Sequence, residues 1–529
     1  MATVNTATEA NKQAITLTKI QALTSSLGIK LAAGDLKDWH SLLASNQDSI
    51  DVVNALPDYV PFVDLARFAR KNVHRPTVEQ NEGNAWAWKV TIDGVPEGPL
   101  KGVRIALKDN IAVKDVPMLF GTDMFSDYVP NVDATVVTRL LEAGAIIVGK
   151  AVCENLSLCA SSFSAATGPV ENPYAHGYAC GGSSSGCGHL VGAGKVDGAI
   201  GGDQGGSIRF PASHCGAVGM KPTWGLVPWT GMATHEPVHD TTGPITLEVA
   251  INAKILQAIA GRDDIDDRGC GVPAPSELPD YSAGLNQGVK GLKIGILKEG
   301  FEFDILDPRI KKQVLEAAEK FKELGAEVVE ISIPIHRHAT DIVTCALRPS
   351  SARNGYLGTA CGRRGLYLNG LVEKMNPLDQ EKFDKMFSAS KFALLSGLYI
   401  WANHPLLPGK AMNLYRLLTD SYNTALSSCD VLITPTMPYV APRHASIDAS
   451  PMEQMAKSKG CAINTSCFNA SGHPAMSLPV GMLSAVEDKN VMLPVGMQIT
   501  GKWFAEEMIY RVGAAWEQAF DWKNGGTRR

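Results

Sequence analysis

Two glycine-rich stretches hold the serines whose setting best suits nucleophilic chemistry. Residues 181–188 read GGSSSGCG, and residues 201–211 read GGDQGGSIRFP with a fourth serine. A serine hydroxyl attacks a carbonyl carbon only when a base accepts its proton. A lysine can serve as that base when desolvation lowers its pKa from ~10.4 by about 3 units. The pattern therefore predicts a serine nucleophile and directs attention to buried lysines.

Two other interpretations of residues 181–188 fit less well. A Gly/Ser linker has polar neighbours, whereas this stretch runs on into the apolar, glycine-rich residues 189–222. An α/β-hydrolase elbow would centre on Ser184, but that motif lies between a buried strand and a helix. The preceding residues 168–180, GPVENPYAHGYAC, are rich in turn formers. Neither a linker nor an elbow is therefore expected.

Strands that alternate with helices must position these serines. The pattern predicts helices within residues 133–150, 307–334 and 505–520, and strands within residues 102–113, 133–150, 292–297, 307–334, 430–436, 474–481 and 493–501. Such alternation predicts an α/β fold with a mostly parallel, mixed central sheet covered by helices on both faces. Residues 1–90 carry apolar residues at helical spacing, which predicts an N-terminal helical accessory domain before a catalytic domain at 91–529.

Composition excludes several classes of function. Of the 529 residues 45% are hydrophobic, and the net charge of -5 comes without a basic block, which argues against nucleic-acid binding. The apolar residues 392–402 are too few for the ~20-residue membrane helix, so they predict a core helix or an apolar lip at a substrate entrance. The N-terminus lacks the apolar region of a signal peptide, and the 11 scattered cysteines form no CxxC pair. Reduced thiols and a cytoplasmic location are expected.

No metal ion or other cofactor is expected. His235 and His239 have the spacing of two ligands on one helix, but Pro237 between them is incompatible with a regular helical ligand pair.

Five segments together resemble the amidase signature family. They are GVRIALKDNIAV (102–113), GPVENPYAHGYACGGSSSG (168–186), GGDQGGSIRFPASHCGAVGMKPT (201–223), FNASGHPAMSLPVG (468–481) and LPVGMQITGKWFAEEMIYRVGAAWEQA (493–519). The resemblance covers residues from about 95 to 520. It implies the amidase signature fold and a hydrolase that cleaves the C–N bond of carboxamides.

The resemblance also implies a Ser–cis-Ser–Lys triad. Ser207 matches the nucleophile, Ser183 the bridging serine and Lys108 the base, with a cis peptide bond between Gly182 and Ser183. Lys108 ends an apolar strand, where desolvation disfavours the ammonium form. Asp109 beside it would raise the lysine pKa if its carboxylate pointed toward Lys108.

Backbone N–H groups around the nucleophile are expected to form the oxyanion hole. The expected donors are Gln204, Gly205, Gly206 and Ser207. Glycines let such a turn direct its amides toward one point. Asp203 and Arg209 are expected to support the turn from behind, and Ser184 to have a structural role.

An apolar substrate pocket is expected from residues 116–125, Trp229 and part of residues 340–425. Its predicted members are Met118, Phe120, Gly121 and Trp229. GGDQGGS with KPTWGLVPWTG (221–231) resembles the branch of nitrile-pathway amidases and urethanases, which implies small aliphatic or aromatic amides as substrates and allows a homodimer. Carbamate hydrolysis and aryl acylamidase activity stay open as alternatives.

Three further classes fit less well. The long helical N-terminus and the absence of a basic face argue against the amidase-type component of a tRNA-dependent amidotransferase. A lipid amidase bound to a membrane would need an apolar cap, for which only residues 392–402 offer a hint. A non-enzymatic scaffold would be expected to lack one of Lys108, Ser183 and Ser207, and all three are present.

Overall fold

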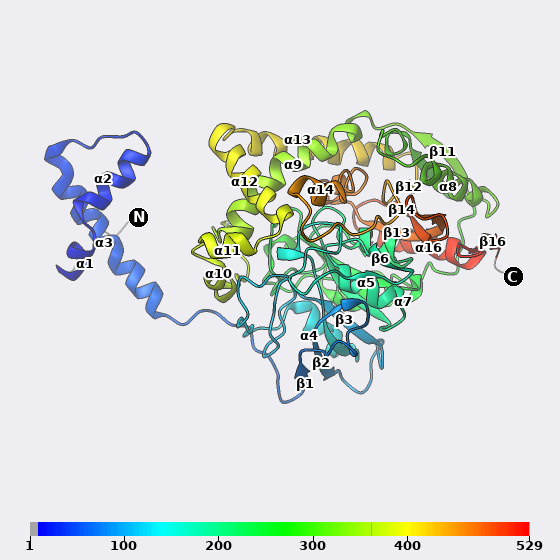
Figure 1. The fold of residues 1–529 in the computed structure, drawn as a ribbon, viewed down its shortest axis with the longest axis horizontal. Helices are drawn as coiled ribbons and strands as arrows, with labels where there is room; N and C mark the ends of the chain where they lie inside the picture. Colours follow the sequence, from blue (N-terminus) through cyan, green and yellow to red (C-terminus); the bar gives the residue numbers. More distant parts are fainter. Residues whose placement is uncertain (1–8, 361, 528–529) are drawn as a thin grey trace. The chain divides into compact units, whose positions relative to one another are not determined.

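The computed structural model describes residues 9–360 and 362–527, and the chain forms two units, Met1–Phe62 and Val63–Arg529. The first unit is helical, as predicted, with α1 (Glu9–Ala14), α2 (Leu17–Ser26) and α3 (Leu36–Ala55) (Figure 1). The division falls at residue 62, not at the expected residue 90. The reason is that β1 (Lys71–His74) and β2 (Trp86–Asp93) pair with the sheet of the second unit.

A sheet of 12 strands forms the centre of the second unit. Its strands lie in the order β1-β2-β4-β3-β7-β9-β8-β13-β14-β12-β10-β11. Beyond β1 and β2 they are β3 (Arg104–Lys108), β4 (Ile146–Ala151), β7 (Gly198–Asp203), β8 (Val218–Lys221), β9 (Thr241–Thr246), β10 (Lys293–Leu297), β11 (Glu327–Ile331), β12 (Val431–Pro435), β13 (Ala475–Ser484) and β14 (Met492–Thr500). The expected mixed sheet is confirmed.

The sheet is less parallel than the sequence indicates. Parallel pairing joins β3 to β4 and β7, and β10 to β11 and β12; the other neighbouring strands described in this sheet run antiparallel. The antiparallel pairs include β13 with β14, whose register runs from Ala475 opposite Thr500 to Ser484 opposite Met492. Hairpin partners of this kind carry the same apolar run as buried parallel strands, so composition does not separate them.

Helices cover both faces of the sheet, as predicted (Figure 1). One face packs on α4 (Thr135–Glu142), α7 (Val249–Ile259), α8 (Pro308–Glu319) and α16 (Glu506–Ala519). The other packs on α5 (Ser185–Gly192) and α6 (Arg209–His214). Side chains alternate between the faces of a strand. Accordingly Ile105 and Leu107 of β3 belong to the first core, and Ala106 belongs to the second.

Residues 339–426 add a helical layer beside the sheet. It comprises α9 (Ala339–Ser350), a π-helical turn at Ser351–Tyr356, α10 (Asn369–Met375), α11 (Gln380–Lys385), α12 (Ser388–Asn403) and α13 (Leu407–Leu426). The short helices α14 (Pro451–Ala456) and α15 (Ser466–Ala470) follow, and the small ladders are β5 (Glu171–Asn172) with β6 (Ala175–Ala179), and β15 (Phe520–Asp521) with β16 (Gly526–Thr527).

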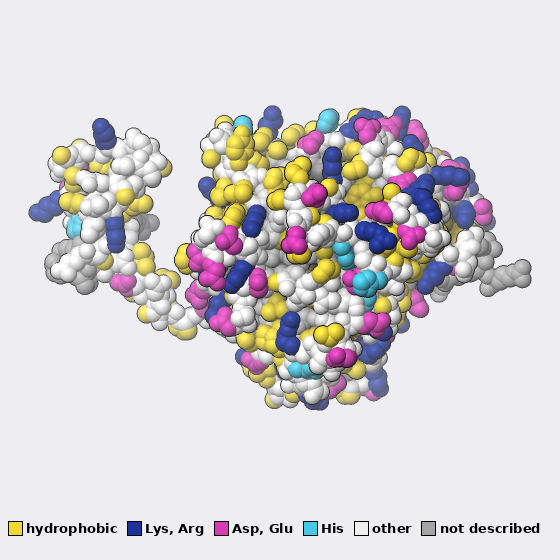
Figure 2. Space-filling view, in the orientation of Figure 1, with side chains coloured by type: hydrophobic (Ala, Val, Ile, Leu, Met, Phe, Trp, Pro, Cys, Tyr) yellow, Lys and Arg dark blue, Asp and Glu magenta, His cyan; other side chains and the backbone are white. Residues whose placement is uncertain are grey.

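Helix α12 contains the apolar residues 392–402 and is only half buried. Ala393 and Leu394 face the core, whereas Phe392, Leu395 and Tyr399 are exposed. Figure 2 shows hydrophobic side chains gathered over this helix. The segment is therefore not a fully buried core helix. None of the helices in the described residues is both long and apolar enough to cross a membrane.

Candidate active site

Strand alternation positions Lys108 beneath the serines. Lys108 ends β3 on the same face as Ala106, toward α5. Its Nζ donates a hydrogen bond to Ser183 Oγ at 2.8 Å and another to the carbonyl oxygen of Gly202 at 3.2 Å. Both Lys108 and Ser183 are completely buried. Burial lowers the pKa of Lys108, which favours the neutral amine that a general base must be.

Asp109 does not oppose this effect, because its carboxylate is occupied elsewhere. Asp109 Oδ1 lies 2.9 Å from Lys150 Nζ, in an ion pair that is itself buried. Asp109 Oδ2 accepts the backbone N–H groups of Leu119 and Phe120 at 2.9 and 3.0 Å. The two neighbouring residues thus bind different partners, and Asp109 fixes the loop that follows β3.

Ser183 follows a cis peptide bond to Gly182, as the resemblance implies. A Cβ at Gly182 would lie 2.8 Å from the carbonyl oxygen of Cys159 and from Glu154 Cγ, so only glycine fits there. Ser183 Oγ also lies 3.3 Å from Ser157 Oγ, a third hydroxyl that no sequence motif indicated. The bridging position therefore has a partner on two sides, lysine on one and serine on the other.

Ser207 lies in the turn between β7 and α6 and borders a cavity of about 200 Å³. Gln204, Gly205 and His235 line the same cavity. The Ser207 side chain makes no hydrogen bond to any residue that the structure describes. The structure therefore joins Lys108 to Ser183 and leaves the Ser183–Ser207 hydrogen bond unformed. The Ser207 hydroxyl is free to rotate toward the cavity.

The backbone amides of the turn divide into two groups. Gly206 N–H was expected to be an open donor of the oxyanion hole. It donates instead to Asp203 Oδ1 at 2.7 Å and so supports the turn. The amides of Gln204, Gly205 and Ser207 donate to no other described residue. Gly206 has a φ of 142°, and a Cβ there would meet the Phe210 ring at 2.2 Å. A glycine is required at 206 to give this turn its shape.

Asp203 and Arg209 form a completely buried ion pair behind the turn. Arg209 Nη2 and Nε donate to the two Asp203 oxygens at 2.9 and 3.0 Å. Arg209 also donates to Asn469 Oδ1, Gln498 Oε1 and the carbonyl oxygen of Thr465. Burial alone would raise the pKa of the Asp203 carboxyl, but the Arg209 charge and these hydrogen bonds lower it to about 2. The pair thus stays ionised and ties α6 to β14 and the segment around α15.

We expect Asp203→Asn to lower the free energy of unfolding by about 3–5 kcal/mol, because it leaves the Arg209 charge buried without its counter-charge. Urea titration measures this. The sign with pH follows from the lowered carboxyl pKa: the stabilisation is present above the ordinary value of 3.8 and is lost as the pH falls through about 2.

Asp197→Asn is the matched control for this ion-pair prediction. Asp197 pairs with Arg104 at 3.3 Å, but both side chains are nearly half exposed, so less than about 1 kcal/mol should be lost. Equal losses of unfolding free energy in the two variants would contradict the supporting role of the buried pair.

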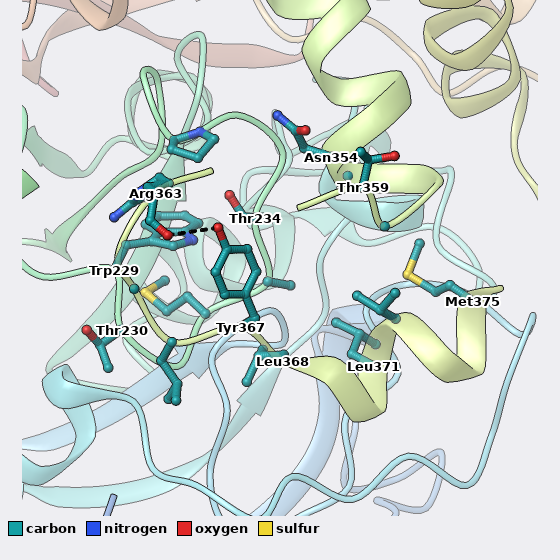
Figure 3. A pocket seen from close by; sticks show the side chains of 18 of the residues that line it. Trp229, Thr230, Thr234, Asn354, Thr359, Arg363, Tyr367, Leu368, Leu371 and Met375 are labelled. Atoms are coloured by element: carbon teal, nitrogen blue, oxygen red, sulfur yellow. Dashed lines mark hydrogen bonds between the residues drawn. The ribbon is translucent and has the colours of Figure 1, made fainter. Parts of the chain in front are cut away.

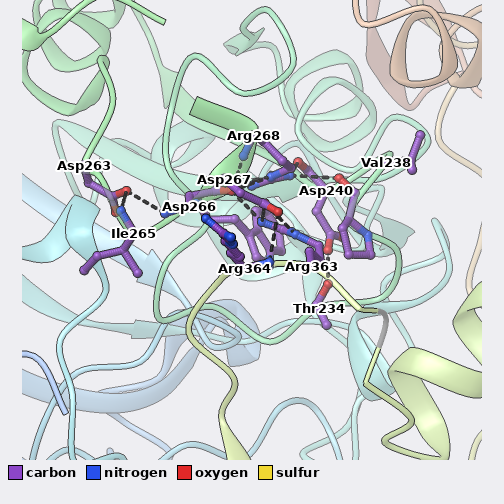
Figure 4. A network of polar contacts seen from close by, with 12 residues as sticks. Thr234, Val238, Asp240, Asp263, Ile265, Asp266, Asp267, Arg268, Arg363 and Arg364 are labelled. Atoms are coloured by element: carbon purple, nitrogen blue, oxygen red, sulfur yellow. Dashed lines mark hydrogen bonds and ion pairs between the residues drawn. The ribbon is translucent and has the colours of Figure 1, made fainter. Parts of the chain in front are cut away.

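The Gln204 side chain anchors the turn to a second polar network, in which Figure 4 shows Asp240, Arg268 and Arg363 close together. Gln204 Nε2 donates to Asp240 Oδ1 at 3.0 Å. The carbonyl oxygen of Asp240 accepts from Arg268, which pairs with Asp266 at 2.6 Å. Arg363 also contacts Asp266, at 2.6 Å. The network therefore connects the turn that holds Ser207 with Arg363 of the helical layer, and no sequence pattern indicated this connection.

The expected apolar pocket is not the cavity that holds Ser207. Phe120 and Trp229 line a separate cavity of about 90 Å³, together with Tyr367 and Leu371 of the helical layer (Figure 3). Met118 is buried in a core cluster and lines neither cavity. A Cβ on Gly121 would lie 2.3 Å from the carbonyl oxygen of Glu154, so that glycine serves close backbone packing.

The variable region 340–425 does contribute to the cavity that Ser207 borders. Its contributions are Leu347, Arg348, Ser351 and Ala389, from α9, the π-helical turn and α12. Met455, Ser458, Cys461 and Ala462 complete one wall. Composition did not single out any of these residues, because they converge from distant parts of the chain.

The described residues contain no group of three or more His, Cys, Asp or Glu side chains that could hold a metal ion. His239 lies instead against Tyr415, with its Nε2 2.7 Å from the tyrosine hydroxyl. The described cysteines are free thiols, and Cys153, Cys180 and Cys187 among them are buried.

Comparison with known proteins finds amidases among the proteins that are similar to this chain. A family model described as Amidase matches residues 65–510. An enantioselective amidase of Rhodococcus rhodochrous is 36% identical over 452 residues, which cover 84% of each chain. One subunit of the glutamyl-tRNA(Gln) amidotransferase of Geobacter metallireducens is 35% identical over 430 residues, covering 80% of this chain and 84% of the relative. The crystal structure of a bacterial aryl acylamidase superposes with a TM-score of 0.67 at 25% identity, covering 80% of this chain and 83% of the other.

Proposed function

Because the chain belongs to the amidase signature family of amide-hydrolysing enzymes, we propose that it cleaves small aliphatic or aromatic carboxamides to a carboxylate and ammonia or an amine. The observation that carries this proposal is the 2.8 Å hydrogen bond from buried Lys108 to Ser183, next to the turn that presents Ser207 to a cavity. A desolvated amine in contact with a hydroxyl supplies the base that a serine nucleophile needs.

In the proposed reaction, proton transfer runs from Ser207 through Ser183 to Lys108 and is later reversed. Ser207 Oγ attacks the amide carbon while its proton passes to Ser183, and Ser183 gives its own proton to neutral Lys108. The open amides of Gln204, Gly205 and Ser207 bind the oxyanion. The proton then returns to the leaving nitrogen, the C–N bond breaks, and an acyl-enzyme is left on Ser207. Water hydrolyses that ester by the same relay, which regenerates the serine.

Relatives of two kinds bear on the substrate. The enantioselective amidase and the aryl acylamidase support hydrolysis of carboxamides or anilides. The amidotransferase relative raises a glutamine-dependent function with partner subunits. We favour the first, because the net charge of -5 comes without a basic block and the first unit is helical. Carbamate hydrolysis is the second candidate. A homodimer and a cytoplasmic location belong to the same proposal.

We expect the purified protein by itself to hydrolyse butyramide or benzamide, with kcat/KM at least about tenfold above that for ethyl carbamate and acetanilide. Ammonia release or amine release measures each rate. Preference for the carbamate or the anilide would move the assignment to the corresponding alternative. Ammonia release from glutamine alone, dependent on added amidotransferase partner proteins, would overturn the proposal.

A further inference from the structure

Arg348 brings a positive charge to the nucleophile cavity. It lies in α9 and lines the cavity that Ser207, Gln204 and Gly205 border. Among the described residues that line this cavity, it is the one with a permanently charged side chain. The remaining lining is made of apolar residues, serines, cysteines, glutamine and histidine. The cavity therefore has a net positive electrostatic character.

The Arg348 guanidinium has no counter-charge among the residues that the structure describes. It makes no ion pair and no hydrogen bond to any part of the chain that the structure describes, and its Nη1 is buried without an acceptor. The guanidinium stacks over the Phe392 ring, with Cζ 4.9 Å from the ring centroid. Burial lowers the pKa of Arg348, as expected for a cation without a partner.

Arg209 and Arg268 are buried and paired, whereas Arg348 is partly exposed and only its Nη1 is buried without an acceptor. Arg209 has Asp203 at 2.9 Å and Arg268 has Asp266 at 2.6 Å. A buried donor of a charged group costs free energy when it has no partner, and a bound ligand can supply that partner. Arg348 has no such carboxylate partner, and it lines the cavity in which the substrate of the proposed reaction must bind.

We propose that Arg348 binds a carboxylate carried by the substrate, so that the preferred substrates are amides that also bear a carboxylate group. This inference rests on the proposed amidase function and makes its substrate class narrower. Guanidinium and carboxylate form two parallel charge-assisted hydrogen bonds, for which Arg348 has unused donors. The cavity of about 200 Å³ is smaller than the roughly 300 Å³ at which drug-sized ligand sites begin, which suits a small substrate.

The carboxylate can belong to the acyl part or to the amine part of the amide, and two substrate pairs distinguish these sources. Succinamate and 4-methylpentanamide differ by a carboxylate against an isopropyl group in the acyl part. N-acetylglycine and N-isobutylacetamide differ in the same way in the amine part. We expect the wild-type enzyme to prefer the carboxylate member of one pair by roughly 30-fold or more in kcat/KM, the scale for a buried charge pair.

Arg348→Met should abolish that preference, mainly through KM, and Arg348→Lys should retain part of it. Arg353→Met is the matched control. Arg353 follows in the π-helical turn and stacks on Trp401 at 3.8 Å, but it is exposed and lines neither described cavity. The control should keep the wild-type preference.

A binding measurement separates this inference from the proposed activity. Calorimetry with succinate on an inactive Ser207→Ala background should show binding that Arg348→Met removes. Hydrolysis without any carboxylate preference, or an equal loss of preference in the Arg348 and Arg353 variants, would overturn the role of Arg348 and leave the amidase function intact. Absence of hydrolysis with every amide would refute the proposed function, and succinate binding would then decide the role of Arg348 independently.

Discussion

Replacing Ser207 with alanine is expected to lower kcat by roughly 10⁶-fold, the scale on which a serine hydrolase loses activity without its nucleophile. No other serine can substitute. The hydroxyl of Ser183 is held by Lys108, and the Ser184 hydroxyl donates to the carbonyl oxygen of Gly202 at 3.3 Å. Steady-state ammonia release from the preferred amide measures the loss.

Ser185→Ala is the control for the nucleophile. Its hydroxyl is buried and donates to the carbonyl oxygen of Val152 at 3.4 Å. Because the residue touches neither the lysine nor the cavity, activity should stay within about threefold of wild type. Circular dichroism should be unchanged in both variants. Residual turnover above about 1% in Ser207→Ala would refute the assignment of the nucleophile.

Lys108→Met is expected to lower kcat by about 10⁴-fold, at the upper end for loss of a general base. Methionine keeps much of the buried side-chain volume, so the change removes the base without opening a large cavity. In the wild type, kcat should rise with pH as the ammonium loses its proton, because only the neutral amine accepts one. Burial lowers the Lys108 pKa, so this rise should lie below the ordinary value of 10.5.

The pH profile distinguishes a base from a structural lysine. Lys108→Met should lose the rise in kcat together with the rate, whereas Lys114→Met, on the half-exposed segment after β3, should keep both. A Lys108 variant that is slow but retains the wild-type profile would show that another group titrates, and would contradict the relay.

Local sequence patterns were sufficient for the elements that carry the triad. The run VRIAL before Lys108 forms β3, and residues 475–484 and 492–500 form the two long strands that the apolar runs indicated. Glycines at 182 and 206 were also informative, because each stands where a side chain would collide with its neighbours. The strands and Gly206 depend on nearby residues, whereas the contacts that require Gly182 come from Cys159 and Glu154.

Long-range partners could not be predicted in this way. Asn469 Nδ2 donates to Asp203 Oδ1 at 2.9 Å, and Thr465 Oγ1 donates to the carbonyl oxygen of Gly205 at 2.6 Å, in each case between residues far apart in the sequence. No spacing rule connects such residues. The prediction of a mostly parallel sheet was wrong for the same reason. The direction of each strand depends on the segment that connects it to the next strand and not on its own composition. The aromatic residues Phe120 and Trp229 looked suited to a substrate pocket, but they line another cavity.

Peptide mapping of an acid-quenched acyl-enzyme tests the central claim most directly. A p-nitrophenyl ester of a small carboxylic acid should give a burst of p-nitrophenol, and mass spectrometry of the quenched protein should then locate the acyl group. The account predicts one acyl group, on Ser207, and none in Ser207→Ala. An acyl group on Ser183, Ser184 or Ser185, or undiminished acylation in Ser207→Ala, would contradict it.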